Sequence, residues 1–291
     1  MANEITEAFA KQYADNFLLI SQQKKSRLES CVRVDSGIVG ASKTVDAVGS
    51  SSARKRTTRN DDSPLIKTPF YRRWIDLADY DWGDLIDDQD KIRLMTDPTS
   101  SVVAVGVAAM NRSKDDVIIS ALGGSARTTD AGATIVALPA GQKIAAGAAG
   151  LTLAKLITAK ELLLTSEAIN EDDPQDALFM VVTAQQLSNL LNTTEVKNAD
   201  YNTVKALVQG SVDTFMGFKF IRSQRLSKVG TSRFCYGFCK SGVVLGIGKD
   251  MTNRVTERSD KCFAVYPYAM MSLGAVRTEE AKVVEIECIE V

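Results

Sequence analysis

The sequence predicts an α+β fold that carries a long projecting arm. Three observations support this prediction: a helical apolar pattern over residues 99–123, several short segments with period-two alternation, and a polar run, GSSSARKRTTRNDDSP, between two of those segments. With 291 residues, of which 45% are apolar and 24% charged, the chain can bury one large or two modest cores. Disorder over the whole chain is therefore not expected.

The first element is an amphipathic helix, expected over residues 4–20. Its apolar side chains Ile5, Phe9, Tyr13 and Phe17 recur every fourth position and form one stripe. The stripe fits equally well a first helix packed on its own core and an arm that touches a neighbour.

Residues 31–81 are interpreted as an extended, hairpin-like excursion. Two limbs of roughly 18 residues at about 3.3 Å per residue would reach roughly 60 Å, whereas a compact chain of this length has a radius of gyration of about 19 Å. We therefore expect that the arm cannot fold back into its own globule.

Charge is segregated along this excursion. Residues 53–73 hold seven basic and two acidic side chains, a net charge of +5, and residues 76–90 hold seven aspartates and no basic residue. Both tryptophans, Trp74 and Trp82, lie at the junction, where aromatic surface is useful for burial against a partner. The alternative is a solvated charged loop with aromatic side chains packed beneath it.

Two strong helices are predicted in the middle of the chain. The first covers residues 99–123, where apolar residues recur from Val103 to Ala121 until Gly123-Gly124 ends the pattern, and at about 1.5 Å per residue it is roughly 35 Å long. The second covers 151–170. The run EDDPQD, 171–176, is interpreted as a boundary.

A mixed unit of strands and helices is expected after this boundary. ALFMVV is typical of a buried strand, and Thr183 with Gln186 forms a capping-box pattern that opens a helix through Leu191. The last segment, VVEIECIEV, alternates as a half-buried strand with its two central glutamates on the exposed face. A further short helix is predicted at 202–209, and further strands at 212–222, around 233–247 and at 262–268.

Composition excludes several classes of enzyme. The chain has no histidine, which removes Ser-His-Asp, Cys-His and His-metal sites. Its net charge of −1 argues against a dedicated nucleic-acid binder. An odd number of cysteines, five, favours a reducing compartment, and no signal peptide or membrane span is expected.

Four local motifs are weak. Gly246-Ile-Gly-Lys249 lacks two residues of a phosphate loop, Cys235 and Cys239 lack partners for zinc, and Ser21-x-x-Lys24 lacks its companion motifs. The aspartates of 79–90 are of the type that binds Mg²⁺, but their spacing does not match a calcium loop. Two alternatives stay open: a Mg²⁺-dependent enzyme using Asp84, Asp87 and Asp88, and a DNA-binding protein using Arg54 to Arg59.

Several longer blocks resemble the major capsid proteins of tailed bacteriophages, particularly the short-tailed group. The blocks are MANEITEAFAKQYADN, SQQKKSRLESCVRV, YDWGDLIDDQDKIRLMTDPTS, KDDVIISALGG, FMVVTAQQLSNLL and GSVDTFMGFKFIRS. The resemblance implies the Hong Kong 97 type coat fold. In that fold we expect an N-terminal arm at 1–30, an extended loop at 31–80, a peripheral domain at 81–174 and 266–291 with spine helix 99–123, and an axial domain at 175–265, with the last strand returning to the peripheral sheet.

The resemblance also implies a function. We expect a coat protein, not an enzyme, that needs no cofactor or metal, self-assembles through pentamers and hexamers into an icosahedral shell in the bacterial host cytoplasm, and undergoes procapsid maturation. Expected partners are a separate scaffolding protein, a portal and packaged double-stranded DNA without sequence-specific contacts, with no membrane. A nanocompartment shell of the same fold is the alternative. The candidate inter-subunit contact residues are Arg54, Lys55, Arg56, Arg59, Arg72, Arg73, Trp74, Trp82, Asp84, Asp87 and Asp88.

Overall fold

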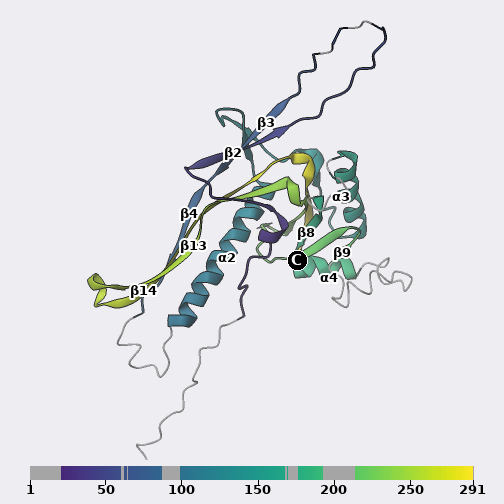
Figure 1. The fold of residues 1–291 in the computed structure, drawn as a ribbon. Helices are drawn as coiled ribbons and strands as arrows, with labels where there is room; N and C mark the ends of the chain where they lie inside the picture. Colours follow the sequence, from purple (N-terminus) through teal and green to yellow (C-terminus); the bar gives the residue numbers. More distant parts are fainter. Residues whose placement is uncertain are drawn as a thin grey trace, which may run out of the picture.

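The longest helix of the described residues is α2 (Thr99–Gly123). The computed structural model describes residues 21–59, 62–63, 65–86, 99–167, 169, 176–192 and 214–290. The helix has 25 residues, as the sequence predicted, and a long twisted sheet lies along it (Figure 1). The helices predicted at 4–20 and 202–209 lie outside the described residues, as does most of the boundary at 171–176.

The sheet along α2 has four strands. Its order is β1 (Arg33–Ser36), β13 (Val243–Arg258), β14 (Ala264–Arg277) and β4 (Ala78–Gly83). All neighbours are antiparallel except β1 and β13. The segment predicted as strand around 233–247 is divided between β12 (Ser232–Cys239), which belongs to another sheet, and the start of β13, with a 3-10 turn between them. The strand predicted at 262–268 is β14, which runs further, to Arg277. The outer half of β13 is exposed on both faces and shows no apolar alternation, so that its pairing with β14 gives the only signal for its length.

A seven-stranded sheet forms the other half of the body. Its order is β7 (Lys143–Ile144), β15 (Val283–Ile289), β12 (Ser232–Cys239), β8 (Leu178–Val182), β10 (Phe218–Arg222) and β9 (Thr214–Phe215), and β11 (Lys228–Val229) pairs with β12. The helices α3 (Leu153–Thr165) and α4 (Ala184–Leu191) belong to this half (Figure 1).

The last strand was predicted wrongly in two respects. It does not return to the sheet along α2, because β15 pairs with β12 and β7. It is also more than half-buried, because its expected outer face carries Glu285, which is only 8% exposed and forms an ion pair with Lys143 at 3.4 Å.

The run FMGFKFI is a hairpin and not a single strand. Met216 and Gly217 both have positive φ, 54° and 85°, and turn β9 back onto β10. This conformation matches the two-residue turns that fit the twist of paired strands. The glycine was visible in the sequence, but Met at the first turn position is not a turn signal.

A third sheet carries the arm. Its order is β2 (Ser42–Val48), β3 (Phe70–Asp76), β5 (Ala126–Thr128) and β6 (Thr134–Val136). The alternating segment CVRV was taken as part of the excursion, but its Cys31 ends η1 and its Arg33 and Val34 begin β1 in the sheet along α2. Short 3-10 helices complete the structure: η1 (Glu29–Cys31), η2 (Ala140–Gln142), η4 (Lys240–Gly242), η5 (Ser259–Lys261) and η6 (Glu280–Lys282).

One large cluster of buried side chains joins the two halves. It contains Leu122 of α2, Leu156 of α3, Phe238 of β12 and Leu245 of β13, all fully buried. The two predicted domains therefore share apolar contacts across their boundary, and the boundary itself stays a prediction.

Arg277 closes the C-terminal end of α2. Its guanidinium is 1% exposed and donates to the carbonyl oxygens of Leu122 at 3.0 Å, Gly124 at 2.8 Å and Val136 at 3.3 Å. A cation at this end satisfies carbonyls that the helix leaves without partners and opposes the negative end of its dipole. Burial lowers the pKa of Arg277.

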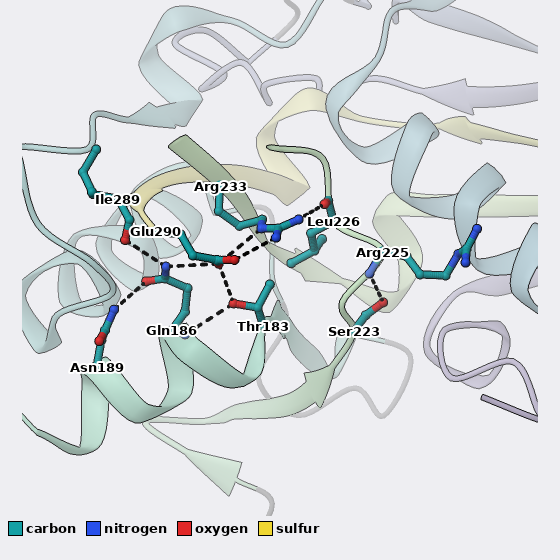
Figure 2. Close-up of polar contacts among 9 residues, drawn as sticks. All are labelled: Thr183, Gln186, Asn189, Ser223, Arg225, Leu226, Arg233, Ile289 and Glu290. Atoms are coloured by element: carbon teal, nitrogen blue, oxygen red, sulfur yellow. Dashed lines mark hydrogen bonds and ion pairs between the residues drawn. The ribbon is translucent and has the colours of Figure 1, made fainter. Parts of the chain in front are cut away.

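Glu290 fastens the end of the chain (Figure 2). Its carboxylate accepts from Arg233 at 2.7 and 3.2 Å and from the Thr183 hydroxyl at 2.9 Å. Thr183 also caps α4, since its hydroxyl accepts from the amide of Gln186, as predicted. The Gln186 side chain does not complete a capping box. It accepts from the Leu151 amide at 2.8 Å and donates to the Ile289 carbonyl at 3.0 Å.

Candidate inter-subunit surface

The projecting arm, here the ribbon of β2 and β3 and not the N-terminal segment 1–30, continues into an extended loop. β2 and β3 pair from Ser42↔Asp76 to Val48↔Phe70, and the Gly49 amide donates to the Pro69 carbonyl at 2.8 Å as the last rung. Beyond that rung the described residues of 49–69 project away from the body (Figure 1). The name extended loop is used from here on for residues 49–69, a shorter segment than the predicted 31–80. A Cβ on Gly49 would lie 2.7 Å from the Tyr71 ring, so the close approach at the rung requires glycine.

The described side chains of the extended loop face solvent. Leu65 is 90% exposed and Ile66 46% exposed, and the basic side chains Arg54, Lys55, Arg56 and Arg59 are all exposed. The Arg56 guanidinium donates to the carbonyls of Thr58, at 3.0 Å, and of Arg59, and thus holds the tip in a local turn. Exposed apolar side chains on an extended segment are typical of a surface that becomes buried in an assembly.

The predicted basic residues nearer the body have partners within the same chain. Arg72 forms ion pairs with Asp46 at 2.7 Å and Asp130 at 3.0 Å. The hydrogen bond from Arg72 holds the pKa of Asp46 below its usual value. Arg73 is buried and donates from one nitrogen to both carboxylate oxygens of Glu280 at 2.7 Å.

The two tryptophans are also used within the subunit. The Trp74 indole donates to the Thr129 carbonyl at 2.8 Å, and the Arg127 guanidinium lies 5.9 Å from its ring centroid. The Trp82 ring packs on α2 at Gly106, where a Cβ would lie 2.3 Å from the ring. The exposed aromatic side chains of the arm are instead Phe70 and Tyr71, which are 76% and 55% exposed.

Strand β4 presents an acidic edge. It is the last strand of its sheet, and its exposed aspartates Asp79 and Asp81 alternate with Tyr80 and Trp82, which pack on the core. Asp84 follows β4 and is also exposed. None of the three aspartates forms an ion pair within the part of the chain that the structure describes. Asp87 and Asp88 lie outside it.

A groove runs beside this acidic edge. It has a volume of about 330 Å³ and lies between α2, β4 and β14, with Tyr80, Val117 and Leu273 in its lining. A larger cavity of about 660 Å³ lies on the other side of α2, against β12 and β15. The residues Asp116 and Ser120 line both and form the ridge between them.

The described residues contain no group of three or more His, Cys, Asp or Glu side chains suited to a metal ion. Within the same residues, no helix is long and apolar enough to cross a membrane. The five cysteines are free thiols, and only Cys262 is exposed.

Sequence reasoning missed the buried polar residues that hold the elements together. Lys155 is 9% exposed, and its ammonium donates to four backbone carbonyls, those of Ala146, Ala149, Gly150 and Glu287, at 2.7 to 3.0 Å. The helical pattern of 151–170 placed Lys155 on α3 but gave no signal that it points inward.

The whole chain matches a known family. Residues 5–290 match the phage capsid protein family. This chain belongs to that family. It is a structural subunit that assembles with copies of itself into the head shell of a virion, and not an enzyme. No curated protein matches its sequence.

Solved phage capsids share the fold. The capsid of the cyanophage P-SCSP1u is 17% identical, with a TM-score of 0.75 over 98% of this chain and 94% of that chain. The capsid of Ralstonia phage GP4 is 12% identical, with a TM-score of 0.77 over 100% and 98% of the two chains. A match to Mycobacterium phage Che8 is 15% identical, with a TM-score of 0.71 over 97% of both chains. The predicted Hong Kong 97 type coat fold is confirmed.

Proposed function

We propose that this capsid protein is the major coat protein of a tailed phage with a double-stranded DNA genome, and that its extended loop lies on an adjacent copy in the shell. The observation that carries the proposal is the loop itself: it exposes Leu65 and a cationic tip, and it projects away from the rest of its own chain (Figure 1). An isolated subunit gains nothing from such a loop, because fixing its backbone costs about 1–2 kcal/mol per residue without compensating burial.

The acidic edge of β4 is the proposed seat of the loop tip. It carries Asp79, Asp81 and Asp84 without counter-charges in the described chain, and the tip carries basic side chains in excess. Within one subunit the loop projects from the end of β2 and β3 away from β4 (Figure 1). Complementary charge sets the register and rate of association more than its affinity, so burial of Leu65, Ile66, Phe70 and Tyr71 supplies the affinity.

The candidate contact residues divide into two groups under this proposal. Arg54, Lys55, Arg56, Arg59 and Asp84 act between subunits, and Asp87 and Asp88 extend the acidic surface. Arg72, Arg73, Trp74 and Trp82 act within the subunit. The first three hold the arm at a fixed angle to the body, and Trp82 packs β4 on α2. A fixed angle matters because the loop has to reach the same place on every neighbour.

The remaining partners follow from the same proposal. Copies form pentamers and hexamers, a separate scaffolding protein and a portal take part in assembly in the host cytoplasm, and the finished shell holds DNA without sequence-specific contacts. A net charge of −1 supports the last point, because a strongly cationic subunit would retain the genome. The predicted division into an arm at 1–30, a loop at 31–80, a peripheral domain at 81–174 and 266–291 and an axial domain at 175–265 is proposed with one change. Because β13 pairs with β14 and β15 pairs with β12, β13 is assigned to the peripheral side and β15 to the axial side.

Negative-stain microscopy of the purified full-length protein, alone and with its scaffolding candidate, tests the proposal. Closed shells are expected at neutral pH and moderate salt, with isolated pentamers or hexamers as precursors. A protein that stays monomeric under all these conditions would contradict the proposed function.

A further inference from the structure

The first described segment of the chain is fastened along α2. Asp115 is fully buried, and its carboxylate accepts from the Ser26 hydroxyl at 2.6 Å, from the amides of Arg27 and Leu28 at 3.2 Å, and from the Gln23 side chain. Asn111 adds a bond to the Lys24 carbonyl at 2.9 Å. Residues 21–32 are therefore ordered on the helix by its polar side chains.

The outward face of this segment is basic. Lys24, Lys25, Arg27 and Arg33 are all exposed. β10 lies beside the segment, since the Arg27 guanidinium donates to the Arg222 carbonyl. Burial raises the pKa of the Cys31 thiol, and the nearby charge of Lys219 in β10 opposes that rise. The exposed side chain of Lys219 thus lies near the same surface.

Within the described part of the chain these cations form no ion pairs. The five side chains are here called the basic face, and the acidic side chains near them already have other partners. Asp115 accepts hydrogen bonds from backbone amides. Glu29 forms an ion pair with Lys114 at 3.3 Å, and Asp35 forms one with Lys43 at 2.7 Å. The basic face comprises Lys24, Lys25, Arg27, Arg33 and Lys219.

The basic face offers charge with little apolar surface. Val34, at 44% exposed, is the one large apolar side chain of residues 21–36 that is exposed. Protein interfaces need a buried apolar core, but binding to a phosphodiester backbone is dominated by charge and released counterions. The chemistry of the face therefore fits a polyanion better than a protein.

We propose that the basic face points into the shell and contacts the phosphates of the packaged DNA. The proposal rests on the proposed function, since it assumes a closed shell that holds a genome. Five cations on a subunit with a net charge of −1 give weak, sequence-independent contacts that orient the subunit without holding the DNA permanently.

Amine labelling of assembled particles tests the proposal. DNA-filled particles and particles emptied of DNA are treated with a small amine reagent that passes through the shell, and each lysine is quantified by mass spectrometry. Lys25 and Lys219 should be labelled severalfold less in filled particles, and Lys228 and Lys261, which are exposed elsewhere, should be labelled equally in both. Equal labelling of Lys25 and Lys219 in filled and emptied particles would overturn the proposal.

Two other outcomes also decide. Protection that occurs only in precursor particles containing a scaffolding protein would assign the basic face to an acidic segment of that protein and overturn the DNA contact. Microscopy before labelling shows whether shells form. If no shells form, the proposed function and this proposal are both contradicted; if shells form but labelling is equal, only this proposal is.

A matched pair of variants gives an independent readout. The triple variant Lys25→Gln, Arg33→Gln, Lys219→Gln should form shells of normal size that release their DNA at a lower temperature than the wild type. The control Lys228→Gln, Arg254→Gln, Lys261→Gln removes the same three charges from other exposed positions and should not change DNA release. Equal effects of the two triple variants would mean that only total charge matters, which would overturn the proposal.

Discussion

The carboxylate of Asp115 in α2 accepts a hydrogen bond of 2.6 Å from the hydroxyl of Ser26, 89 residues earlier in the chain. Ser26 in turn accepts from the amide of Glu29 at 3.2 Å, at the start of η1. One buried charge thus orders the chain that leads into β1. It does so by satisfying backbone donors, which is the most favourable setting for a buried carboxylate.

Asp115→Asn should destabilise the unassembled subunit by about 2–4 kcal/mol, because an amide cannot accept from all these donors and leaves buried amides unpaired. Urea denaturation of the subunit measures this change. Asp116→Asn is the control, since Asp116 pairs with Arg225 at the surface and its loss should cost less than about 1 kcal/mol. Equal losses in the two variants would contradict the anchoring role of Asp115.

Gly106→Ala should destabilise the subunit although alanine is normally better than glycine inside a helix by about 1 kcal/mol. The reason is the Trp82 ring, 2.3 Å from the added Cβ, which must move out of its packed position. We expect a net loss of about 1–3 kcal/mol in thermal or urea unfolding. Trp82→Leu should remove most of the penalty in the double variant, and a stabilising Gly106→Ala would show that the ring is free to move.

Elements with a strong local pattern could be predicted from the sequence. The helices α2, α3 and α4 and the strand β8 have helical or apolar patterns that can be recognised without knowing which elements they contact. The outer half of β13 and the partner of β15 could not be predicted, because both depend on pairing with residues far along the chain.

The candidate surface could be predicted only in part, because its charge pairs also join residues far apart in the sequence. The net charge of residues 53–73 identified the basic loop tip correctly as an exposed feature. The same sum included Arg72 and Arg73, whose charges are cancelled by Asp46 and Glu280, 26 and 207 residues away. A charge count along the sequence cannot separate paired from unpaired cations.

Deletion of residues 49–62 should leave a folded, soluble subunit that forms no closed shells. The described loop residues contribute nothing to the buried core, so the deletion removes surface and not stability. Circular dichroism and microscopy together measure the two properties. Shells of normal size from the deletion variant would contradict the role of the loop.

Reversal of Lys55, Arg56 and Arg59 to Glu should slow shell assembly, with the largest effect at low salt, because surface charges are screened over about 10 Å at 0.1 M ionic strength. Light scattering during assembly measures the rate. Reversal of Asp79, Asp81 and Asp84 to Lys in the same chain should restore part of it. Reversal of Lys228, Arg254 and Lys261 to Glu is the control for total charge, and an equal slowing there would contradict specific pairing.

The stability of the subunit should fall in acid through Glu290. The hydrogen bond from Arg233 lowers the pKa of this carboxyl below its ordinary value of 4.5. A lowered folded-state pKa gives stability that is complete above the unfolded pKa and is lost as the pH falls through the folded pKa. Arg233→Met should therefore cost stability at pH 7, and its difference from the wild type in urea denaturation should shrink below about pH 4. A difference that is constant with pH would contradict this linkage.

The position of the loop tip in the shell is tested most directly by cross-linking between differently labelled copies. Arg56→Cys and Asp81→Cys are placed in separate chains that also carry Cys262→Ser, which removes the only exposed native thiol, and the two chains are assembled together and oxidised. A disulfide-linked pair containing one chain of each kind is predicted in the shells. A chain that carries both Arg56→Cys and Asp81→Cys is assembled as a comparison. A disulfide within that single chain, with no disulfide between the two singly substituted chains, would show that the loop lies on its own subunit and would contradict the account.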